Sequence, residues 1–299
     1  MKSLSYQPVP CVALPLPEAT AQGVTVAVLR EDVNHPFVSG NKWWKLKHNL
    51  EAAQRQHHHT LLTFGGPYSN HIYATAAAAR ELGLASIGII RGERVLNPTL
   101  QFAQACGMRL HFISRAQYRE KDQPELLSTF AHQFGDCYVV PEGGTNTLAV
   151  QGCATWGAQL WQHYQPDIIF LPVGTGGTMA GLACGLAGRA QIHGVSVLKG
   201  PDLLTAAVTQ WVQRYTTNTY NNWHIHTAYA HGGYGKTTPE LLALMARIKN
   251  DFALPLDRVY TAKMFSAVVD LLQRGTFPRG SRILLVHTGG LQGNGHYVS

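Results

Sequence analysis

The chain has 299 residues, with 24 Lys and Arg against 17 Asp and Glu, so its formal net charge is +7. Hydrophobic residues make up 45% of the chain and charged residues 14%, which excludes a disordered tail, a collagen and a coiled coil. The positive charge favours anionic ligands. Its basic residues are scattered without a long run, so we expect no nucleic-acid partner.

The five cysteines show no spacing typical of a metal or redox motif. An odd number of cysteines in a chain of this length is typical of reduced thiols. The first residues lack the apolar core of a signal peptide, and no apolar run is long enough to span a membrane. We therefore expect a cytoplasmic protein with no membrane partner and no bound metal.

Short apolar runs alternate along the chain with stretches of helical periodicity. The expected strands are 24–29, 61–64, 86–90, 109–113, 138–140, 168–172, 194–198, 225–230 and 283–287. The expected helices are 42–56, 71–82, 99–105, 149–163, 179–187, 203–215, 239–249 and 260–273. This alternation predicts an α/β fold with parallel strands covered on both faces. Glycine-rich breaks near 40 and 143–147 predict a small α/β domain, 46–147, inserted into a large domain of 1–45 and 148–299.

Glycine-rich turns follow four of the expected strands, at the end where ligands bind in open α/β sheets. One of them reads Gly174-Thr175-Gly176-Gly177-Thr178 and opens a helix. Glycines let consecutive N–H groups form an anion nest, and the helix adds positive partial charge. The two threonines add hydroxyl donors, so we predict a phosphate site. The alternative is a tight turn with a threonine cap. A dinucleotide fingerprint is excluded because Met179 stands where it needs glycine.

Two further segments begin helices. Lys42 lies in the first turn of one, where the helix dipole lowers the pKa of an amine and prepares it for Schiff-base chemistry. Ser69 and Asn70 follow Gly65-Gly66, a pair that suggests close approach of another group. The alternatives are a solvated lysine and an ordinary helix cap at Ser69 or Asn70.

Other motifs point elsewhere. The segment 230–237, Ala-His-Gly-Gly-Tyr-Gly-Lys-Thr, nearly matches a nucleotide-binding P-loop, but Pro239 follows it and no strand supplies a magnesium ligand. A nucleotide-binding protein is therefore an alternative. His57-His58-His59 lacks the partners of a zinc site, and no GxSxG elbow of a hydrolase occurs.

Seven ordered segments, spanning about residues 10–297, together resemble the D-cysteine desulfhydrase / 1-aminocyclopropane-1-carboxylate deaminase family. They are Arg30-Glu31-Asp32, Ser39-Gly40-Asn41-Lys42 with Lys45-Leu46, Gly65-Gly66 with Ser69-Asn70-His71, Pro141 with Gly143-Gly144 and Asn146, Gly174 to Thr178, Val259-Tyr260-Thr261 with Lys263, and His287-Thr288-Gly289-Gly290. The resemblance implies a pyridoxal 5'-phosphate enzyme of fold type II, with two open twisted, mostly parallel sheets flanked by helices and the site between domains. It also implies a homodimer and a small amino acid as substrate.

The resemblance implies roles for individual residues. Lys42 would carry the cofactor. Asn70 would bind its phenolic oxygen, and Thr288 would face its ring nitrogen. The phosphate would be held by Gly174, Thr175, Gly176, Gly177 and Thr178. The substrate would be bound by Ser69, Asn70, His71, Tyr234, Tyr260 and Thr261. Catalysis would fall to Lys42, assisted by Ser69, Tyr234 and Tyr260.

Two positions bear on the substrate. The deaminase pattern has Tyr-Glu and His-Leu-Gly-Gly where this chain has Tyr260-Thr261 and His287-Thr288. Hydroxyl groups at both places resemble the desulfhydrase pattern. Unlike a carboxylate, a hydroxyl group cannot keep the ring nitrogen of the cofactor protonated. This suits α,β-elimination from D-cysteine.

The alternatives are deamination of 1-aminocyclopropane-1-carboxylate or another small amino acid, and a non-catalytic protein that binds the cofactor. The chain departs from the family at Trp43-Trp44, where an arginine is usual in the second place, and at Tyr68, where glutamine is usual. We expect Tyr68 to narrow the pocket.

Overall fold

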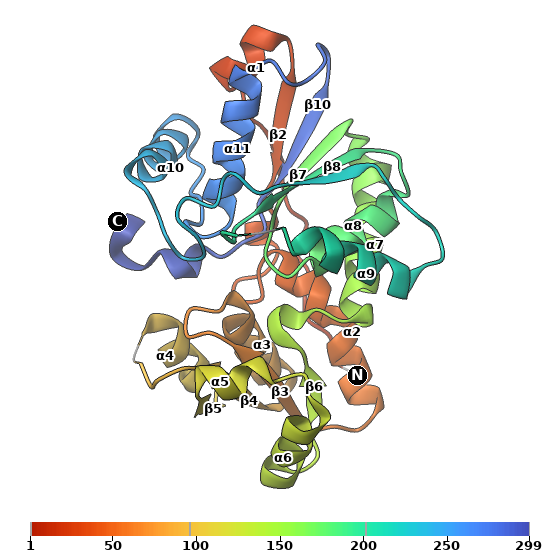
Figure 1. The fold of residues 1–299 in the computed structure, drawn as a ribbon, viewed down its shortest axis with the longest axis vertical. Helices are drawn as coiled ribbons and strands as arrows, with labels where there is room; N and C mark the ends of the chain where they lie inside the picture. Colours follow the sequence, from red (N-terminus) through yellow and green to blue (C-terminus); the bar gives the residue numbers. More distant parts are fainter. Residues whose placement is uncertain (1, 96, 201, 299) are drawn as a thin grey trace.

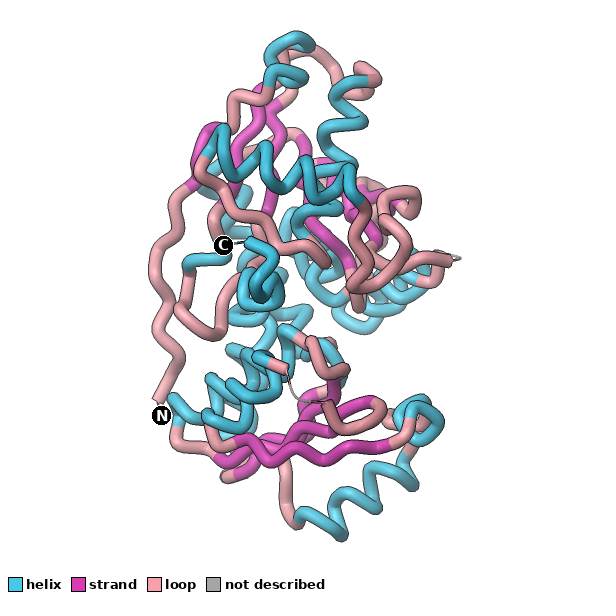
Figure 2. Tube along the Cα trace, turned by 90° about the vertical axis from the view of Figure 1, so that its left-hand side faces the viewer, coloured by secondary structure: helices cyan, strands magenta, loops and turns pink. Residues whose placement is uncertain are grey.

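The structure, a computed structural model, describes residues 2–95, 97–200 and 202–298. Its strands form a six-stranded sheet in the order β1-β2-β10-β7-β8-β9 and a four-stranded sheet in the order β5-β4-β3-β6. Among the described residues every strand pairing is parallel except that of β1 with β2. The two sheets lie at opposite ends of the molecule and carry helices on their faces (Figures 1 and 2). The predicted α/β fold with two mostly parallel sheets is confirmed.

The larger sheet is buried between two layers of helices. Its strands are β1 (Cys11–Ala13), β2 (Thr25–Leu29), β7 (Ile168–Val173), β8 (Gln191–Ser196), β9 (Trp223–His226) and β10 (Arg282–Val286). Alternate residues of β7 point to opposite faces, so Ile168 and Phe170 join one core cluster while Ile169 and Leu171 join another. The first cluster packs under α1 (Pro17–Gln22), α10 (Pro239–Phe252) and α11 (Thr261–Gln273), and the second under α7 (Thr147–Tyr164), α8 (Gly177–Leu186) and α9 (Leu204–Tyr215).

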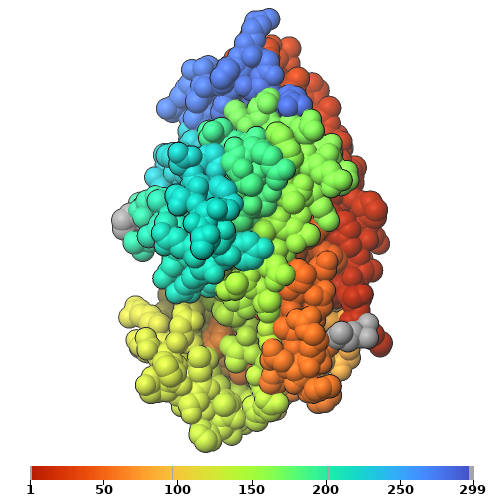
Figure 3. Space-filling view, turned by 90° about the vertical axis from the view of Figure 1, so that its right-hand side faces the viewer, coloured from red at the N-terminus to blue at the C-terminus, as the bar shows by residue number. Residues whose placement is uncertain are grey.

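The smaller sheet consists of β3 (Thr60–Gly65), β4 (Ala85–Arg91), β5 (Met108–Ile113) and β6 (Tyr138–Val140). Its helices are α3 (Asn70–Leu82), α4 (Pro98–Ala105), α5 (Arg115–Arg119) and α6 (Pro124–Phe134). The remaining long helix, α2 (Asn41–Arg55), contacts both α3 and α7, and Figure 3 shows α2 and α7 side by side on the surface. All four strands fall inside the block 46–147, although the domain division itself stays a prediction.

The elements differ from the expected ones mainly at short or amphipathic segments. The sequence analysis did not predict β1, α1, α5 and α6. Expected strand 194–198 begins earlier, at Gln191, and expected strand 225–230 ends at His226. In both places apolar residues continue beyond the last paired residue, but only Val197 and Ala230 among them are buried, whereas Leu198 and Ala228 are exposed. No helix in the described ranges is long and apolar enough to cross a membrane.

Candidate active site

The carboxyl ends of the two sheets meet, and most of the predicted site residues lie there. The hydroxyl oxygens of Thr145, which follows β6, and Thr175, which follows β7, are 2.6 Å apart. On the other side of the site, Gln292 Nε2 donates to Asn70 Oδ1 at 2.9 Å. Because Asn70 follows β3 and Gln292 follows β10, these contacts join both sheets around one site.

The turn before α2 sets the position of Lys42. Gly40 has φ +68° and ψ −144°, which L side chains rarely adopt. The amide of Asn34 binds this turn twice, since its Oδ1 accepts from Gly40 N at 2.9 Å and its Nδ2 donates to Gly40 O at 3.1 Å. The backbone N–H of Asn41 donates to Thr288 O at 3.4 Å. The first turn of α2 therefore starts directly against the end of β10.

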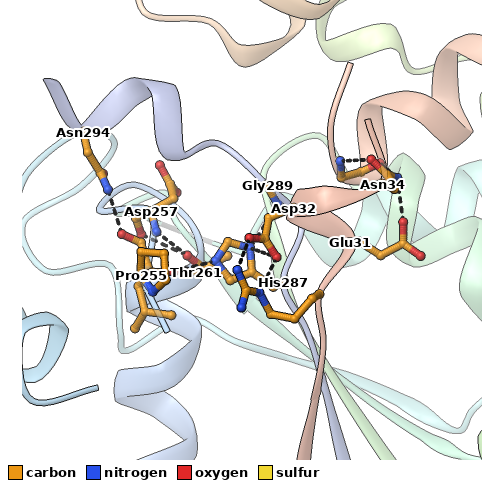
Figure 4. A network of polar contacts seen from close by, with 12 residues as sticks. Glu31, Asp32, Asn34, Pro255, Asp257, Thr261, His287, Gly289 and Asn294 are labelled. Atoms are coloured by element: carbon orange, nitrogen blue, oxygen red, sulfur yellow. Dashed lines mark hydrogen bonds and ion pairs between the residues drawn. The ribbon is translucent and has the colours of Figure 1, made fainter. Parts of the chain in front are cut away.

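Glu31 supports the same turn from below, as Figure 4 shows for its contact with Asn34. Its carboxylate is buried and accepts from Asn34 Nδ2 at 2.6 Å, Tyr6 Oη at 3.1 Å and Trp44 Nε1 at 3.1 Å. Burial raises the pKa of Glu31 to about 7, although these hydrogen bonds favour the charged form. The ring of Trp44 also stacks on Trp156, at 5.6 Å between centroids. The unusual tryptophans of this chain thus belong to the core behind Lys42.

Two lysines lie one turn apart on α2. Burial is the main cause that lowers the pKa of Lys42 to about 8, where the sequence had suggested the helix dipole. Lys45 is only 1% exposed, and its Nζ donates to Thr145 Oγ1 at 2.7 Å and Thr175 Oγ1 at 3.4 Å. Burial and the charge of Lys42 lower the pKa of Lys45 well below its usual value.

No carboxylate in the described part of the chain forms an ion pair with Lys45. A buried ammonium group held only by hydroxyls is costly unless an anion neutralises it. Lys45 is therefore a candidate functional residue that the sequence analysis noticed only as part of a family motif. Its i, i+3 spacing from Lys42 was the available signal.

The glycine turn before α8 forms a cradle beside Lys45. Gly176 has φ +81° and occupies the cap position of α8 without a side-chain bond, so no threonine caps this helix. The hydroxyl of Thr178 instead accepts from Asn41 Nδ2 at 2.9 Å. A β-carbon at Gly177 would lie 2.6 Å from Thr145 Cγ2, so the turn needs glycine there. Two hydroxyls, a helix N-terminus and a buried ammonium group together suit a phosphate.

The helix start at Ser69 combines a structural and a candidate functional role. The hydroxyl of Ser69 caps α3, accepting from the backbone N–H groups of His71 and Ile72. The side chain of His71 is buried, with Nε2 2.7 Å from Thr63 Oγ1. The backbone N–H and the side chain of His71 are thus both engaged, so neither is free for the predicted contact with a substrate carboxylate.

Two tyrosines meet across the mouth of the site. Tyr260 precedes α11, and its hydroxyl donates to that of Tyr234 at 3.2 Å, with the rings nearly perpendicular at 80°. A β-carbon at Gly174 would lie 3.2 Å from Tyr260, so this pair adjoins the phosphate cradle. Tyr68 is 58% exposed, and the expected narrowing of the pocket by its ring stays a prediction.

The hydroxyl of Thr261 is engaged locally. It accepts from Asp257 N at 2.6 Å and donates to Asp257 O at 3.2 Å, contacts that lie within the network of Figure 4. The predicted contact of Thr261 with the substrate thus lacks a free hydroxyl group. Asp257 is a buried carboxyl group that the sequence analysis did not single out. Burial raises its pKa to about 7, and a β-carbon at Gly290 would lie 3.1 Å from its Oδ2 and 2.7 Å from Asn70 Nδ2.

The end of β10 completes the site. Thr288 is 8% exposed, and a β-carbon at Gly40 would collide with its carbonyl group. His287, just before it, is buried between Asp32 Oδ1 at 3.5 Å and Pro255 O at 2.9 Å, as Figure 4 shows. The segment that carries Thr288 is thus fixed on both sides.

The competing motifs do not form sites. The segment 230–237 folds as successive turns in which Gly233 N donates to Ala230 O and Lys236 N donates to Gly233 O, so these N–H groups are not free for a phosphate. In the histidine triplet, His58 Nδ1 lies 3.1 Å from Asp136 Oδ1. No group of three potential metal ligands occurs among the described residues.

Comparison with known proteins agrees with this geometry. Residues 2–289 match the family described as "Pyridoxal-phosphate dependent enzyme". The chain is 30% identical over 289 residues to a "Putative 1-aminocyclopropane-1-carboxylate deaminase" of Pyrococcus abyssi, covering 92% of this chain and 87% of that relative. It is 30% identical over 315 residues to the mitochondrial "Bifunctional D-cysteine desulfhydrase/1-aminocyclopropane-1-carboxylate deaminase" of Arabidopsis thaliana, covering 97% and 78%. A solved "ACC deaminase homologue" superposes with a TM-score of 0.86 at 26% identity, covering 98% of this chain and 93% of that one.

Proposed function

The chain belongs to the family of pyridoxal-phosphate dependent enzymes, and we propose that it is a lyase that converts D-cysteine and water to pyruvate, hydrogen sulfide and ammonia. Its cofactor is pyridoxal 5'-phosphate. The residues present fit that group, because the buried Lys45 ammonium beside two threonine hydroxyls lacks an anion. The observation that carries the proposal is the pair of lysines one turn apart on α2, the partly buried Lys42 and the buried Lys45.

The phosphate would be held by Lys45, Thr175 and the N–H groups at the start of α8. Asn70 would hydrogen-bond the ring oxygen through Nδ2, since Gln292 engages its Oδ1. Thr288 would face the ring nitrogen with a hydroxyl, which donates or accepts a neutral hydrogen bond. When bound, the cofactor supplies an electron sink for the carbanion left by loss of the α-proton.

The chain's own residues would then handle the proton and the substrate. Lys42 would hold the cofactor covalently and, once displaced by the substrate amine, accept the α-proton at Nζ. With a pKa of about 8, about one fifth of this amine is neutral at pH 7.4, far more than for an ordinary lysine. The start of α3, through the Ser69 hydroxyl group and the N–H group of Asn70, would bind the substrate carboxylate. The Tyr234–Tyr260 pair would close the mouth and orient the β-substituent.

The choice of D-cysteine rests on Thr288, because a neutral hydroxyl there suits β-elimination. Thr261 lends less support than its sequence position suggests, because its hydroxyl is bonded to the backbone of Asp257. The names of the relatives keep 1-aminocyclopropane-1-carboxylate as the second candidate. A cytoplasmic homodimer is proposed from the family resemblance, and five free cysteines agree with a reducing compartment.

The test is the visible absorption spectrum of the purified protein, taken before and after addition of D-cysteine, L-cysteine or 1-aminocyclopropane-1-carboxylate. We expect a yellow cofactor band that shifts with D-cysteine, accompanied by sulfide and pyruvate. A shift with the cyclopropane substrate alone, with a four-carbon oxo acid and ammonia, would replace the proposed substrate. A band that no amino acid changes would indicate a non-catalytic cofactor-binding protein, and the lack of any band after cofactor addition would overturn the proposal.

A further inference from the structure

One side of α11 is bonded along its length to the segment 229–234. The bonded pairs are Tyr260 Oη with Tyr234 Oη at 3.2 Å, Lys263 Nζ with Gly233 O at 2.7 Å, Ser266 Oγ with His231 Nε2 at 2.9 Å, and Asp270 Oδ2 with Tyr229 Oη at 2.5 Å. The helix residues are three or four positions apart, so they share one face. Their partners run backwards through the segment, which therefore lies antiparallel to the helix.

Lys263 is the central and least expected member of this series. It is 0% exposed, and no carboxylate in the described ranges forms an ion pair with it. Its Nζ donates to the carbonyl groups of Gly233, at 2.7 Å, and of Val197, just beyond β8, at 3.4 Å. Burial lowers its pKa to about 8. A methionine would fill this space without the cost of desolvating an amine, so packing alone does not account for the lysine.

The bond to Gly233 acts at the base of the turn that carries Tyr234. Gly233 O accepts from Lys236 N at 3.0 Å as well as from Lys263, and this closes a turn whose second residue is Tyr234. Gly232, Gly233 and Gly235 all have positive φ, of +89°, +115° and +70°. A turn so rich in glycine has many accessible conformations, and an external bond is needed to select one.

We propose that Lys263 is a positioning residue that fixes the turn at Gly233 and thereby keeps the hydroxyl of Tyr234 against Tyr260 at the mouth of the active site. This inference rests on the proposed role of Tyr234 in substrate binding. It also explains the P-loop-like glycines of segment 230–237. They form a turn in which the carbonyl oxygen of Gly233 accepts a hydrogen bond from Lys263. The lysine that belongs to the motif itself, Lys236, is exposed.

The test is hydrogen–deuterium exchange of the cofactor-loaded protein, followed in peptides covering residues 229–236. In Lys263→Met we expect about tenfold faster exchange there, because one hydrogen bond to a charged group is lost. The cofactor band should persist, and kcat/KM should fall by about 10- to 100-fold as Tyr234 loses its position. The matched control is Lys236→Met, in the same turn but exposed, which should change neither exchange nor kinetics.

A double variant separates positioning from a general structural effect. If Lys263 acts through Tyr234, adding Lys263→Met to Tyr234→Phe should cost little further activity. Unchanged exchange in a folded Lys263→Met protein, or fully additive losses, would overturn the proposal. If Lys263→Met does not fold, Lys263→Leu, which also has no hydrogen-bond donor, takes its place, and unchanged exchange there would overturn the proposal equally. The exchange measurement needs no substrate, so a failed activity assay would count against the proposed function and not against this inference.

Discussion

A β-carbon on Gly40 would stand 1.9 Å from the carbonyl oxygen of Thr288. This close approach joins the start of α2 to the end of β10, and so sets the distance between Lys42 and Thr288, two residues predicted to hold opposite ends of the cofactor ring system. The turn is closed further by Asn34 and Glu31.

Gly40→Ala should therefore lower both the stability of the protein and its affinity for the cofactor. The φ of +68° and the steric overlap with Thr288 together should cost on the order of 3 kcal/mol. Thermal unfolding and cofactor titration would measure the two effects. The matched control is Gly135→Ala, where φ is +78° and ψ is −158° but no atom lies within 4 Å of the added carbon. Equal losses in the two variants would show that the contact with Thr288 is unimportant.

The parts of the site that the sequence predicts are those with local signals. The glycine turn at Gly174–Thr178 and the helix start at Ser69 lie where a strand ends and a helix begins, and both are visible in the order of residue types. The role of Lys45 is not visible in this way, because it depends on Thr145, which is 100 positions away in the chain. The same holds for Lys263, whose partner Gly233 belongs to a different element.

Glu31 and Asp257 were missed for a related reason. Each lies in a segment of mixed residue types, and nothing in its neighbours tells whether it is buried. Both are at most 1% exposed, so burial alone raises their pKa values. The short elements β1, α1 and α5 were missed because three to six residues give too little periodicity to detect.

Replacement of Lys45 by methionine should weaken cofactor binding without lowering the stability of the cofactor-free protein. Without the phosphate, Lys45 is a buried amine with only hydroxyl partners, so Lys45→Met should leave the cofactor-free protein as stable as the wild type or more stable. Loss of a charged hydrogen bond to the phosphate should weaken cofactor binding about 10- to 100-fold. Thermal unfolding and titration with pyridoxal phosphate would check the two halves.

The matched control for Lys45→Met is Lys47→Met, on the same helix, where the amine lies over the ring of Trp43 at 5.5 Å. This variant should keep the affinity for the cofactor. Unaltered cofactor affinity in Lys45→Met would refute the assignment of Lys45 to the phosphate.

Glu31 should make the stability of the cofactor-free protein depend on pH. Its pKa is raised from 4.5 to about 7 in the folded chain, so the folded state binds its proton more tightly than the unfolded state. The contribution of Glu31 is therefore fully favourable below pH 4.5 and is lost as the pH rises to about 7. The full shift corresponds to a change on the order of 3 kcal/mol.

Denaturant unfolding between pH 4.5 and 7.5 would measure this effect as the difference between wild type and Glu31→Gln. We expect the wild type to lose free energy of unfolding relative to the variant as the pH rises. Asp257, whose pKa is also raised, is present in both proteins and cancels in the difference. Glu93→Gln, at an exposed site, controls for the substitution itself. A difference that does not change with pH would contradict the assigned burial of Glu31.

The reactivity of Lys42 should follow the pKa of about 8 that burial gives it. Only the neutral amine attacks an aldehyde, and with that pKa about half of it is neutral at pH 8, against about 0.3% for an ordinary lysine. The rate of recombination of the cofactor-free protein with pyridoxal phosphate should therefore rise to half its maximum near pH 8 and level off above it. Lys42→Ala should show neither the visible band nor turnover, whereas Lys47→Ala should keep both. A half-rise near pH 10 would show that Lys42 is solvated, and turnover in Lys42→Ala would remove it from the catalytic role.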